Sequence, residues 1–171
     1  MKKILFLVFA VLQVHGKDLR WVNNYDQPFN FLCPTSQSIK TISSVHNNKH
    51  EDRLWDFTCG ATFDGYPSCS LSSYVNGFDA AFDYTCPGDS VMSGMSSYHE
   101  NRHEDRRWQF YCCGMAGFRK EHCSWSNYVN SFDEAFTFNV PLYHYLAGVS
   151  SYHENKHEDR RWRYLLCTKK A

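Results

Sequence analysis

The sequence lacks the features that mark several common protein classes. Beyond residue 16 it has no hydrophobic run long enough for a membrane helix. It has no Gly-x-Ser-x-Gly nucleophile motif, no glycine-rich phosphate loop and no broad basic face. No segment shows a convincing amphipathic helical period. The missing motifs argue against a serine hydrolase, a nucleotide-binding enzyme and a nucleic-acid-binding protein. The missing helical period indicates a β-rich chain.

The one long apolar run lies at the N-terminus. Lys2 and Lys3 precede the apolar stretch 4–14, and small residues stand at the −3 and −1 positions before Lys17. We therefore expect residues 1–16 to be a secretory signal peptide and 17–171 to be a soluble domain secreted to the extracellular space. Removing the two lysines leaves 16 Lys and Arg against 18 Asp and Glu, a formal charge of −2. Gross charge would not hold such a domain to polyanions.

The chain contains three copies of one unit. SSVHNNKHEDRLW (43–55) recurs as SSYHENRHEDRRW (96–108) and SSYHENKHEDRRW (150–162), at steps of 53 and 54 residues. A second block keeps the same step, as WVNNYDQPF (21–29), YVNGFDAAF (74–82) and YVNSFDEAF (128–136). Two blocks with one period indicate internal repeats. We place the repeats at about 17–65, 66–119 and 120–171.

The eight cysteines of an exported chain indicate disulfides, and the repeat suggests how they pair. Cys33 and Cys86 occupy one repeat position and Cys59 and Cys112 another, while the third copy has Val140 and Leu166 at both. If the two positions are joined by a disulfide, a repeat that loses one cysteine is expected to lose the other as well. The remaining four fall into two pairs with equal separation. The predicted bridges are Cys33–Cys59, Cys86–Cys112, Cys69–Cys113 and Cys123–Cys167.

Three segments of each unit have the pattern of strands. Aromatic residues alternate with polar ones in 55–59, 108–112 and 162–166, and again in 29–33, 82–86 and 136–140. A third strand is expected at 41–45, 91–98 and 147–152, and the Asn-containing steps after Val22, Val75 and Val129 are turn signals. The predicted fold is all-β: one disulfide-bonded domain with a pseudo-threefold, trefoil-like or prism-like arrangement.

Two copies contain His-Glu-x-x-His, the string of zinc proteases, at His99–His103 and His153–His157. That chemistry requires a helix that places both histidines on one face. Neither copy lies in a helical pattern, and the first repeat has Asn47 where the base would stand. We therefore predict no catalytic residue, no metal and no cofactor. Metal binding without catalysis is the alternative if the three loops meet, but solvated loop histidines are the preferred interpretation.

The Asp-Arg-x-Trp motif is interpreted as structural. Arg and Trp share strand parity, so the guanidinium is expected against an aromatic ring, with the Asp capping or pairing with a neighbouring Arg. The residues of this motif are Asp52, Arg53, Trp55, Asp105, Arg106, Trp108, Asp159, Arg160 and Trp162.

The loops and the outward strand positions form the candidate binding surface. Their basic side chains could donate hydrogen bonds to sulfate or sugar hydroxyl groups. The candidate ligand-binding residues are His99, Arg102, His103, Arg107, His153, Lys156, His157, Arg161 and Arg163.

These motifs resemble a known family. The repeated Asp-Arg-x-Trp followed by an aromatic residue and Cys, Trp-Val-Asn near the mature N-terminus, and Trp-Gln-Phe-Tyr-Cys-Cys at 108–113 are similar to dermatopontin, over essentially the whole mature chain. The resemblance implies a small non-enzymatic extracellular matrix protein associated with collagen, the proteoglycan decorin, dermatan sulfate and cell adhesion. Invertebrate relatives include shell-matrix proteins and agglutinins, and a related domain occurs in a hydrozoan cytotoxin.

The sequence therefore predicts a secreted matrix or cell-adhesion protein that binds glycoproteins, proteoglycans or glycosaminoglycans and supports collagen fibril assembly. The alternatives are a lectin-like agglutinin of cell-surface glycans and a dermatopontin-like cytotoxin. Homo-oligomers are compatible with either. Nucleic acid is not an expected partner.

Overall fold

The computed structural model describes residues 21–171, so the expected signal peptide lies outside the described residues. This part of the chain is all-β, as predicted, with eleven strands and no helix. It therefore contains no helix of a length and apolarity that could cross a membrane. The strands are β1 (Phe29–Leu32), β2 (Gln37–Asn47), β3 (Asp52–Ala61), β4 (Ser68–Leu71), β5 (Phe82–Thr85), β6 (Val91–Glu100), β7 (Asp105–Gly114), β8 (Lys120–Trp125), β9 (Phe136–Asn139), β10 (His144–Glu154) and β11 (Asp159–Lys169).

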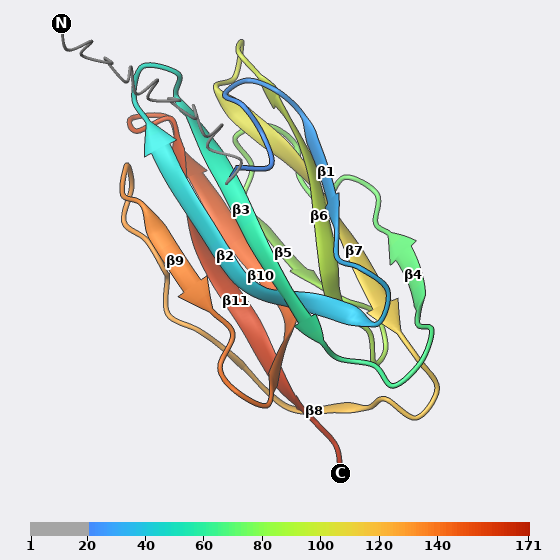
Figure 1. The fold of residues 1–171 in the computed structure, drawn as a ribbon. Coiled ribbons are helices and arrows are strands. Elements are labelled where there is room, and N and C mark those ends of the chain that lie inside the picture. Colours follow the sequence, from blue (N-terminus) through green and yellow to red (C-terminus); the bar gives the residue numbers. More distant parts are fainter. Residues whose placement is uncertain (1–20) are drawn as a thin grey trace, which may run out of the picture.

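Three long hairpins dominate the fold: β2–β3, β6–β7 and β10–β11. They run along the long axis of the molecule, and their turns lie at one end, opposite the C-terminus (Figure 1). Each turn is a four-residue loop, since Asn47 pairs with Asp52, Glu100 with Asp105 and Glu154 with Asp159. Each hairpin also has a register shift at one equivalent position in its first strand. The sequence predicted strands at all these places.

β4 and β8 pair with the hairpin that follows them in the chain, but the short strands β1, β5 and β9 do not. β1 pairs with β6, β5 with β10 and β9 with β2, so each lies in the sheet of another unit. The three sheets are β1-β6-β7-β4, β5-β10-β11-β8 and β3-β2-β9. This exchange links each unit to the next and returns to the first, and the sequence pattern gave no indication of it. Whether the whole is better described as trefoil-like or prism-like stays a prediction.

The core lies where the three hairpins face one another. Trp55, Trp108 and Trp162 are each 1% exposed, and their rings meet edge to face with centroids 4.9–5.1 Å apart. Such T-shaped contacts place the positive ring edge against the negative ring face. Phe57 stacks on Trp55 and Phe110 stacks on Trp108, and Tyr164 belongs to the same apolar cluster. A smaller cluster around Phe63 and Phe118 packs at the opposite end.

The structure contains the four disulfides that the repeat predicts: Cys33–Cys59, Cys69–Cys113, Cys86–Cys112 and Cys123–Cys167. Because β1 and β3 lie in different sheets, the Cys33–Cys59 bridge joins two sheets. In the third unit, Val140 and Leu166 take the two cysteine positions and belong to the same core cluster. An apolar pair thus replaces a covalent bridge there.

Replacing Cys86 and Cys112 by Val and Leu, the pair of the third unit, is expected to preserve the fold. The free energy of unfolding should fall by about 2–4 kcal/mol, because the closed loop of 26 residues no longer restricts the unfolded chain. A Ser and Ser replacement should lose more, because two hydroxyl groups would be buried without an apolar contact. Chemical denaturation of both double variants checks this. Equal losses would contradict the idea that Val140 and Leu166 act as an apolar substitute.

Candidate functional site

The Asp-Arg pairs at the start of β3, β7 and β11 connect the hairpins in a closed cycle. Arg106 donates to Asp52 through two bonds of 2.6 Å, and Arg160 donates to Asp105 in the same way. Arg53 donates to Asp159 at 2.6 and 2.7 Å and completes the cycle. All six side chains are at most 4% exposed. The sequence predicted pairing with an Arg; the structure shows that every pair joins two different hairpins.

Each of these arginines also lies near an aromatic ring, but not the Trp of its own strand. The guanidinium carbons of Arg53, Arg106 and Arg160 are 5.6–5.8 Å from the ring centroids of Phe136, Phe29 and Phe82, respectively. These phenylalanines belong to the short exchanged strands β9, β1 and β5. The arginine therefore contacts two other segments at once.

The first histidine of each loop motif is buried, which corrects the expectation of solvated loop histidines. The side chains of His46, His99 and His153 are 1% exposed and lie at the ends of β2, β6 and β10. The second histidines, His50, His103 and His157, are 32–40% exposed. The first histidine is buried because it still belongs to the first strand of its hairpin, where its side chain faces the core. The turn begins only after it.

The zinc-protease string consequently does not form a single site. His99 faces inward, whereas His103 stacks on Phe78 with ring centroids 4.6 Å apart. Glu100 is exposed at the end of its strand. The two histidines thus lie in different environments, which a strand and turn produce and a helix would not.

The buried histidines surround a cavity of about 20 Å³ at the turn end of the molecule. It is lined by His46, Glu51, Asp52, Arg53, Trp55, His99, Glu104, Asp105, Arg106, Trp108, His153, Glu158, Asp159, Arg160 and Trp162. We call it the axial cavity. Each hairpin supplies the same five residue types, and the three tryptophans lie on the core side.

Three glutamates of the turns belong to the axial cavity: Glu51, Glu104 and Glu158. All three have left-handed backbones, with φ of 47°, 44° and 43°. Partial burial raises the pKa of the Glu104 carboxyl, and the charges of Glu51 and Glu158 raise this pKa further, against the lowering effect of His99.

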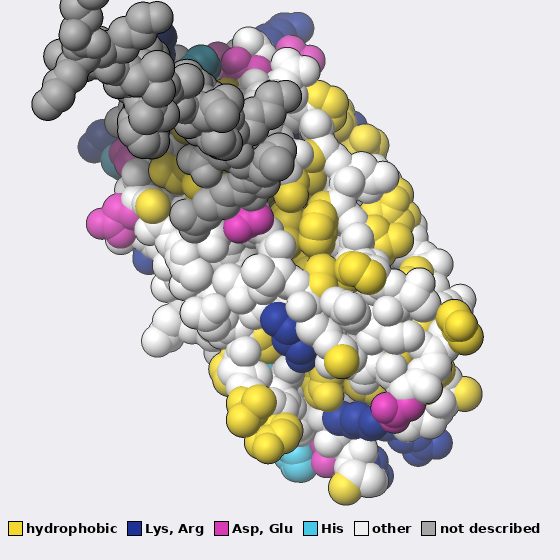
Figure 2. All heavy atoms as spheres, viewed as in Figure 1, with side chains coloured by type: hydrophobic (Ala, Val, Ile, Leu, Met, Phe, Trp, Pro, Cys, Tyr) yellow, Lys and Arg dark blue, Asp and Glu magenta, His cyan; other side chains and the backbone are white. Residues whose placement is uncertain are grey.

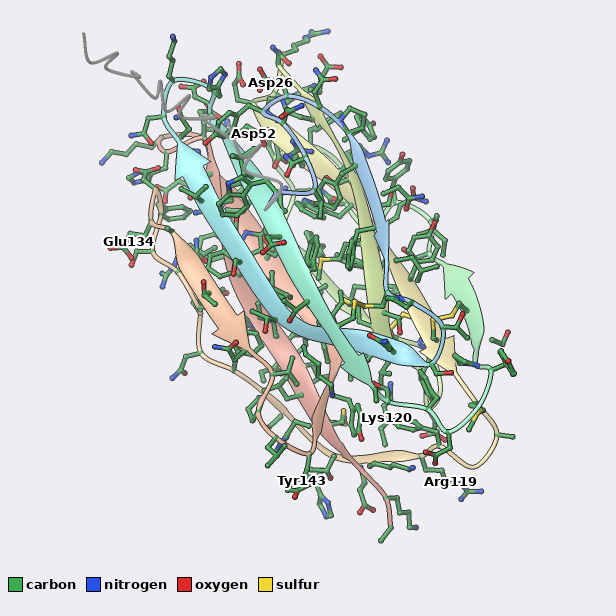
Figure 3. All side chains as sticks on the ribbon, viewed as in Figure 1. Asp26, Asp52, Arg119, Lys120, Glu134 and Tyr143 are labelled. Atoms are coloured by element: carbon green, nitrogen blue, oxygen red, sulfur yellow. A yellow bond between two sulfur atoms is a disulfide. The ribbon has the colours of Figure 1, made fainter. Side chains whose placement is uncertain are left out.

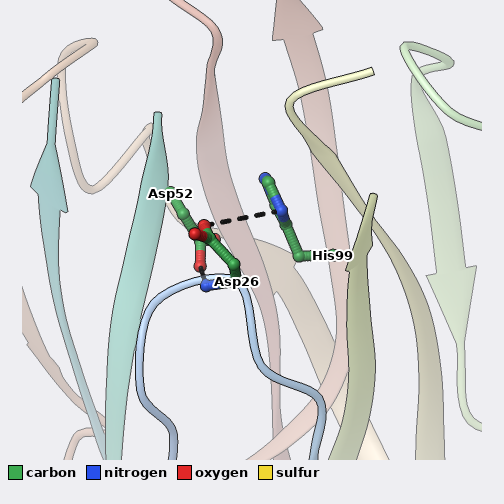
Figure 4. A group of neighbouring side chains, drawn as sticks. All are labelled: Asp26, Asp52 and His99. Atoms are coloured by element: carbon green, nitrogen blue, oxygen red, sulfur yellow. Dashed lines mark hydrogen bonds and ion pairs between the residues drawn. The ribbon is translucent and has the colours of Figure 1, made fainter. Parts of the chain in front are cut away.

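On its other side, each buried histidine faces an aspartate of the 21–29 block or its equivalents. His99 Nδ1 lies 3.7 Å from Asp26 Oδ1, and the Asp26 N–H donates to Asp52 at 2.8 Å (Figure 4). His153 faces Asp79 at 3.7 Å, and His46 faces Asp133 at 3.5 Å. Asp26 and Asp52 both lie at the turn end of the molecule, whereas Arg119, Lys120 and Tyr143 lie at the opposite end (Figure 3).

Two equivalent surface patches combine an arginine with aromatic rings. In the first, Arg107 lies 4.6 Å from the centroid of Tyr74 and donates to the Asn76 carbonyl and the Tyr98 hydroxyl. In the second, Arg161 lies 4.8 Å from Tyr128 and donates to the Asn130 carbonyl and the Tyr152 hydroxyl. We call these the Arg107 patch and the Arg161 patch. At the equivalent position the first unit has Leu54.

The other candidate residues from the sequence are distributed around these patches. His103 and His157 stack on Phe78 and Phe132, which in turn contact Tyr98 and Tyr152. Arg163 lies 5.1 Å from the ring of Trp125 and extends the Arg161 patch. Arg102 and Lys156 are exposed in the turns. His99 and His153 belong instead to the axial cavity.

Sequence reasoning missed two sets of residues. Asn23, Asn76 and Asn130 were interpreted as turn signals, but they are buried. Each accepts a bond from the backbone N–H of the motif Trp and donates to the carbonyl of the motif Arg. The cavity glutamates were missed as well. Their signal was available, because His-Glu-Asp-Arg occurs in all three copies while His-Glu-x-x-His occurs in two.

Arg160→Lys is expected to lower the free energy of unfolding by about 1.5–3 kcal/mol, because an ammonium group cannot make both bonds to Asp105. Arg160→Met should lower it by about 3–5 kcal/mol, since the Asp105 carboxylate would remain buried without its charged partner. Arg161→Lys is the matched control: this neighbour is partly exposed, and its loss should stay within about 1 kcal/mol. Urea denaturation of the three variants measures these losses in the free energy of unfolding. Losses of the same size at 160 and 161 would contradict a structural role for the buried pair.

Comparison with known proteins identifies relatives along nearly the whole chain. The sequence model of the family described as Dermatopontin matches residues 23–171. A hemagglutinin/amebocyte aggregation factor from Limulus polyphemus is 43% identical over 96% of this chain and 94% of its own. Millepora cytotoxin-1 from Millepora dichotoma is 39% identical over 85% of this chain and 65% of its own. A dermatopontin from Biomphalaria glabrata is 39% identical over 86% of this chain and 99% of its own. No solved structure matches the chain significantly.

Proposed function

The chain belongs to the dermatopontin family, and on this basis we propose that it is a secreted, non-enzymatic adhesion protein of the extracellular matrix. Its ligands are the glycan chains of matrix proteoglycans, glycosaminoglycans above all, and through them it supports the assembly of collagen-containing matrix. The four disulfides fit an oxidising extracellular compartment. The chain acts without a catalytic residue.

The observation that carries this proposal is the pair of aromatic–arginine patches. Tyr74 is 42% exposed, and Tyr128 and Trp125 are each 37% exposed, so aromatic ring faces are open to a ligand beside a guanidinium group. Figure 2 shows hydrophobic side chains exposed on the flank that carries β1 and β6. Aromatic faces accept the apolar face of a sugar ring, and a guanidinium donates to sulfate or carboxylate oxygens.

The arginines of the patches are held in place before any ligand arrives. Arg107 uses its Nε and Nη1 groups on the Asn76 carbonyl and the Tyr98 hydroxyl, at 3.0 and 3.4 Å. A guanidinium carries five N–H donors, so these two bonds orient the group without using all of its donors. Fixing a side chain in advance lowers the entropy lost on binding.

A second candidate function is agglutination of cells through surface glycans. The 43% identity with the Limulus hemagglutinin, over nearly the full length of both chains, favours it. Two equivalent patches on one domain supply the two binding points that cross-linking requires. The two functions share the patches and differ in the glycan that is bound.

The test is a glycan and glycosaminoglycan array probed with the wild-type protein and an Arg107→Ala/Arg161→Ala double variant. The double variant should bind at least about tenfold more weakly, because each patch loses its charged donor. Arg119→Ala is the control, since Arg119 is exposed at the opposite end of the molecule (Figure 3). If the double variant binds as well as the wild type, the patches are not the ligand site.

The single variants separate binding from cross-linking. Arg107→Ala and Arg161→Ala each retain one patch, so each should still bind glycan while agglutination of cells falls sharply. Sulfated glycosaminoglycan ligands together with weak agglutination favour the matrix role. Neutral sugars that inhibit agglutination favour the agglutinin. Full agglutination by both single variants would contradict a two-patch mechanism.

A further inference from the structure

The two aromatic–arginine patches lie at equivalent positions but differ in the side chains around the shared arginine. Two residues after this arginine, the second unit has Gln109 and the third has Arg163. Three residues before the shared tyrosine, the second unit has Leu71 and the third has Trp125. The third unit thus has a second guanidinium and an indole where the second unit has an amide and an aliphatic group.

Both arginines of the third unit lie near the same aromatic ring. The guanidinium carbon of Arg161 is 4.8 Å from the centroid of Tyr128, and that of Arg163 is 5.5 Å from it. Arg163 is also 5.1 Å from the centroid of Trp125. Two positive charges held at one place repel each other, and an anion that contacts both reduces this repulsion. A sulfate or carboxylate group can accept hydrogen bonds from both guanidinium groups.

The protein orients these two guanidinium groups and leaves donors for a ligand. Arg161 uses its Nε and Nη1 groups on the Asn130 carbonyl and the Tyr152 hydroxyl. Arg163 uses its Nε group on the Ser150 hydroxyl at 3.1 Å. Each guanidinium carries five N–H donors, and the Arg163 side chain is 35% exposed. A ligand can therefore reach further donors of both groups from solvent.

One carboxylate competes with an anionic ligand at this patch. Asp83 Oδ1 lies 3.7 Å from Arg163 Nη2, which is longer than a hydrogen bond, and the Asp83 side chain is 70% exposed. Exposed ion pairs of this kind contribute little to stability, so a sulfate group can displace Asp83 at small cost. The second unit has Asn30 at the equivalent position, in the strand that pairs with β6.

The Arg107 patch borders a groove of about 340 Å³. The groove wall includes Asn30, Tyr74, Ser96 and Tyr98, and none of the described residues that line it is charged. Hydroxyl and amide groups exchange hydrogen bonds with sugar hydroxyl groups, and aromatic rings accept the apolar face of a sugar. The volume lies in the range of about 300–1,000 Å³ that small-molecule sites have. This groove suits a neutral sugar.

We propose that the two patches bind different classes of sugar. The Arg161 patch, extended by Arg163 and Trp125, takes an acidic glycan whose sulfate or carboxylate group contacts both guanidinium groups. The Arg107 patch takes a neutral sugar in its groove. This assignment rests on the proposed function, since it requires that both patches bind glycans.

A domain with two unlike sites joins two kinds of glycan rather than two copies of one. The first unit adds no second site for an acidic glycan, because it has Leu54 and Asp56 where the third unit has Arg161 and Arg163. With one acidic site per chain, a single domain cannot cross-link two glycosaminoglycan chains. It would instead connect one such chain to a neutral glycan.

The experiment titrates the secreted protein, with intact disulfides, against a chondroitin sulfate hexasaccharide and against a panel of neutral oligosaccharides on one array. Arg163→Gln gives the third unit the residue of the second. It should weaken binding of the hexasaccharide by at least about tenfold, because one of the two charged donors is lost. Binding of the neutral oligosaccharides and the melting temperature should not change.

Reciprocal variants are the matched controls. Gln109→Arg combined with Leu71→Trp gives the second unit the residues of the third, and it should raise the number of bound hexasaccharides from one to two per chain. Asp83→Asn should strengthen hexasaccharide binding by about two- to fivefold, because it removes the competing carboxylate. Arg107→Ala should weaken binding of the neutral oligosaccharides and leave hexasaccharide binding unchanged.

Three results would overturn the assignment of different sugars to the two patches. Arg163→Gln might weaken the acidic and the neutral probes equally, or Arg107→Ala might weaken hexasaccharide binding as strongly as Arg163→Gln does. The third such result is a wild-type protein that binds no neutral oligosaccharide. The proposed function would survive all three, because it requires only that the Arg107→Ala/Arg161→Ala double variant lose glycan binding.

Discussion

The cycle of buried arginine–aspartate pairs is the interaction on which the rest of the structure depends. Removing a guanidinium and a carboxylate from water costs free energy, which is recovered only when the geometry of the pair is excellent and further hydrogen bonds are made. Here each pair has two bonds, and each arginine also donates to a backbone carbonyl of another unit. Such pairs specify how the three hairpins are aligned relative to one another. A hairpin that slipped by one residue would leave two buried charges unpaired.

The exchange of short strands also connects the three units, as the arginine–aspartate cycle does. β1, β5 and β9 each leave their own unit and complete the sheet of another, so backbone bonds and side-chain charges close the same ring. The consequence at the turn end is geometric. Equivalent residues of the three hairpins must meet, which places three tryptophans in the core and three histidines with three glutamates in one cavity. The aromatic patches remain on the outside, where only the second and third units have an arginine.

Local patterns in the sequence were sufficient for three strands of each unit, the bridges and the family, whereas β4 and β8 were not predicted. A period of two identifies a strand and its inward face, and joint loss of two cysteines identifies a bonded pair. The partner of a strand is a different matter. Nothing in FNFL predicts that β1 pairs with β6, because strand pairing depends on the whole arrangement of the units. The burial of His99 followed from the same cause: the sequence showed a polar loop, and only the convergence of three hairpins makes its first residue part of the interior.

Native-state hydrogen exchange tests the interlocked ring most directly. The backbone amides of Trp55, Trp108 and Trp162 are equivalent probes, each bonded to a buried asparagine of its own unit. If the hairpins hold one another, none can open alone, and all three amides should exchange with one free energy, equal to that of global unfolding. The first and third hairpins are each attached by one disulfide and the second by two, so the first and third would open before the second in a structure of independent units. Exchange at Trp55 or Trp162 through an opening that costs at least about 1.4 kcal/mol less than at Trp108 would contradict the account.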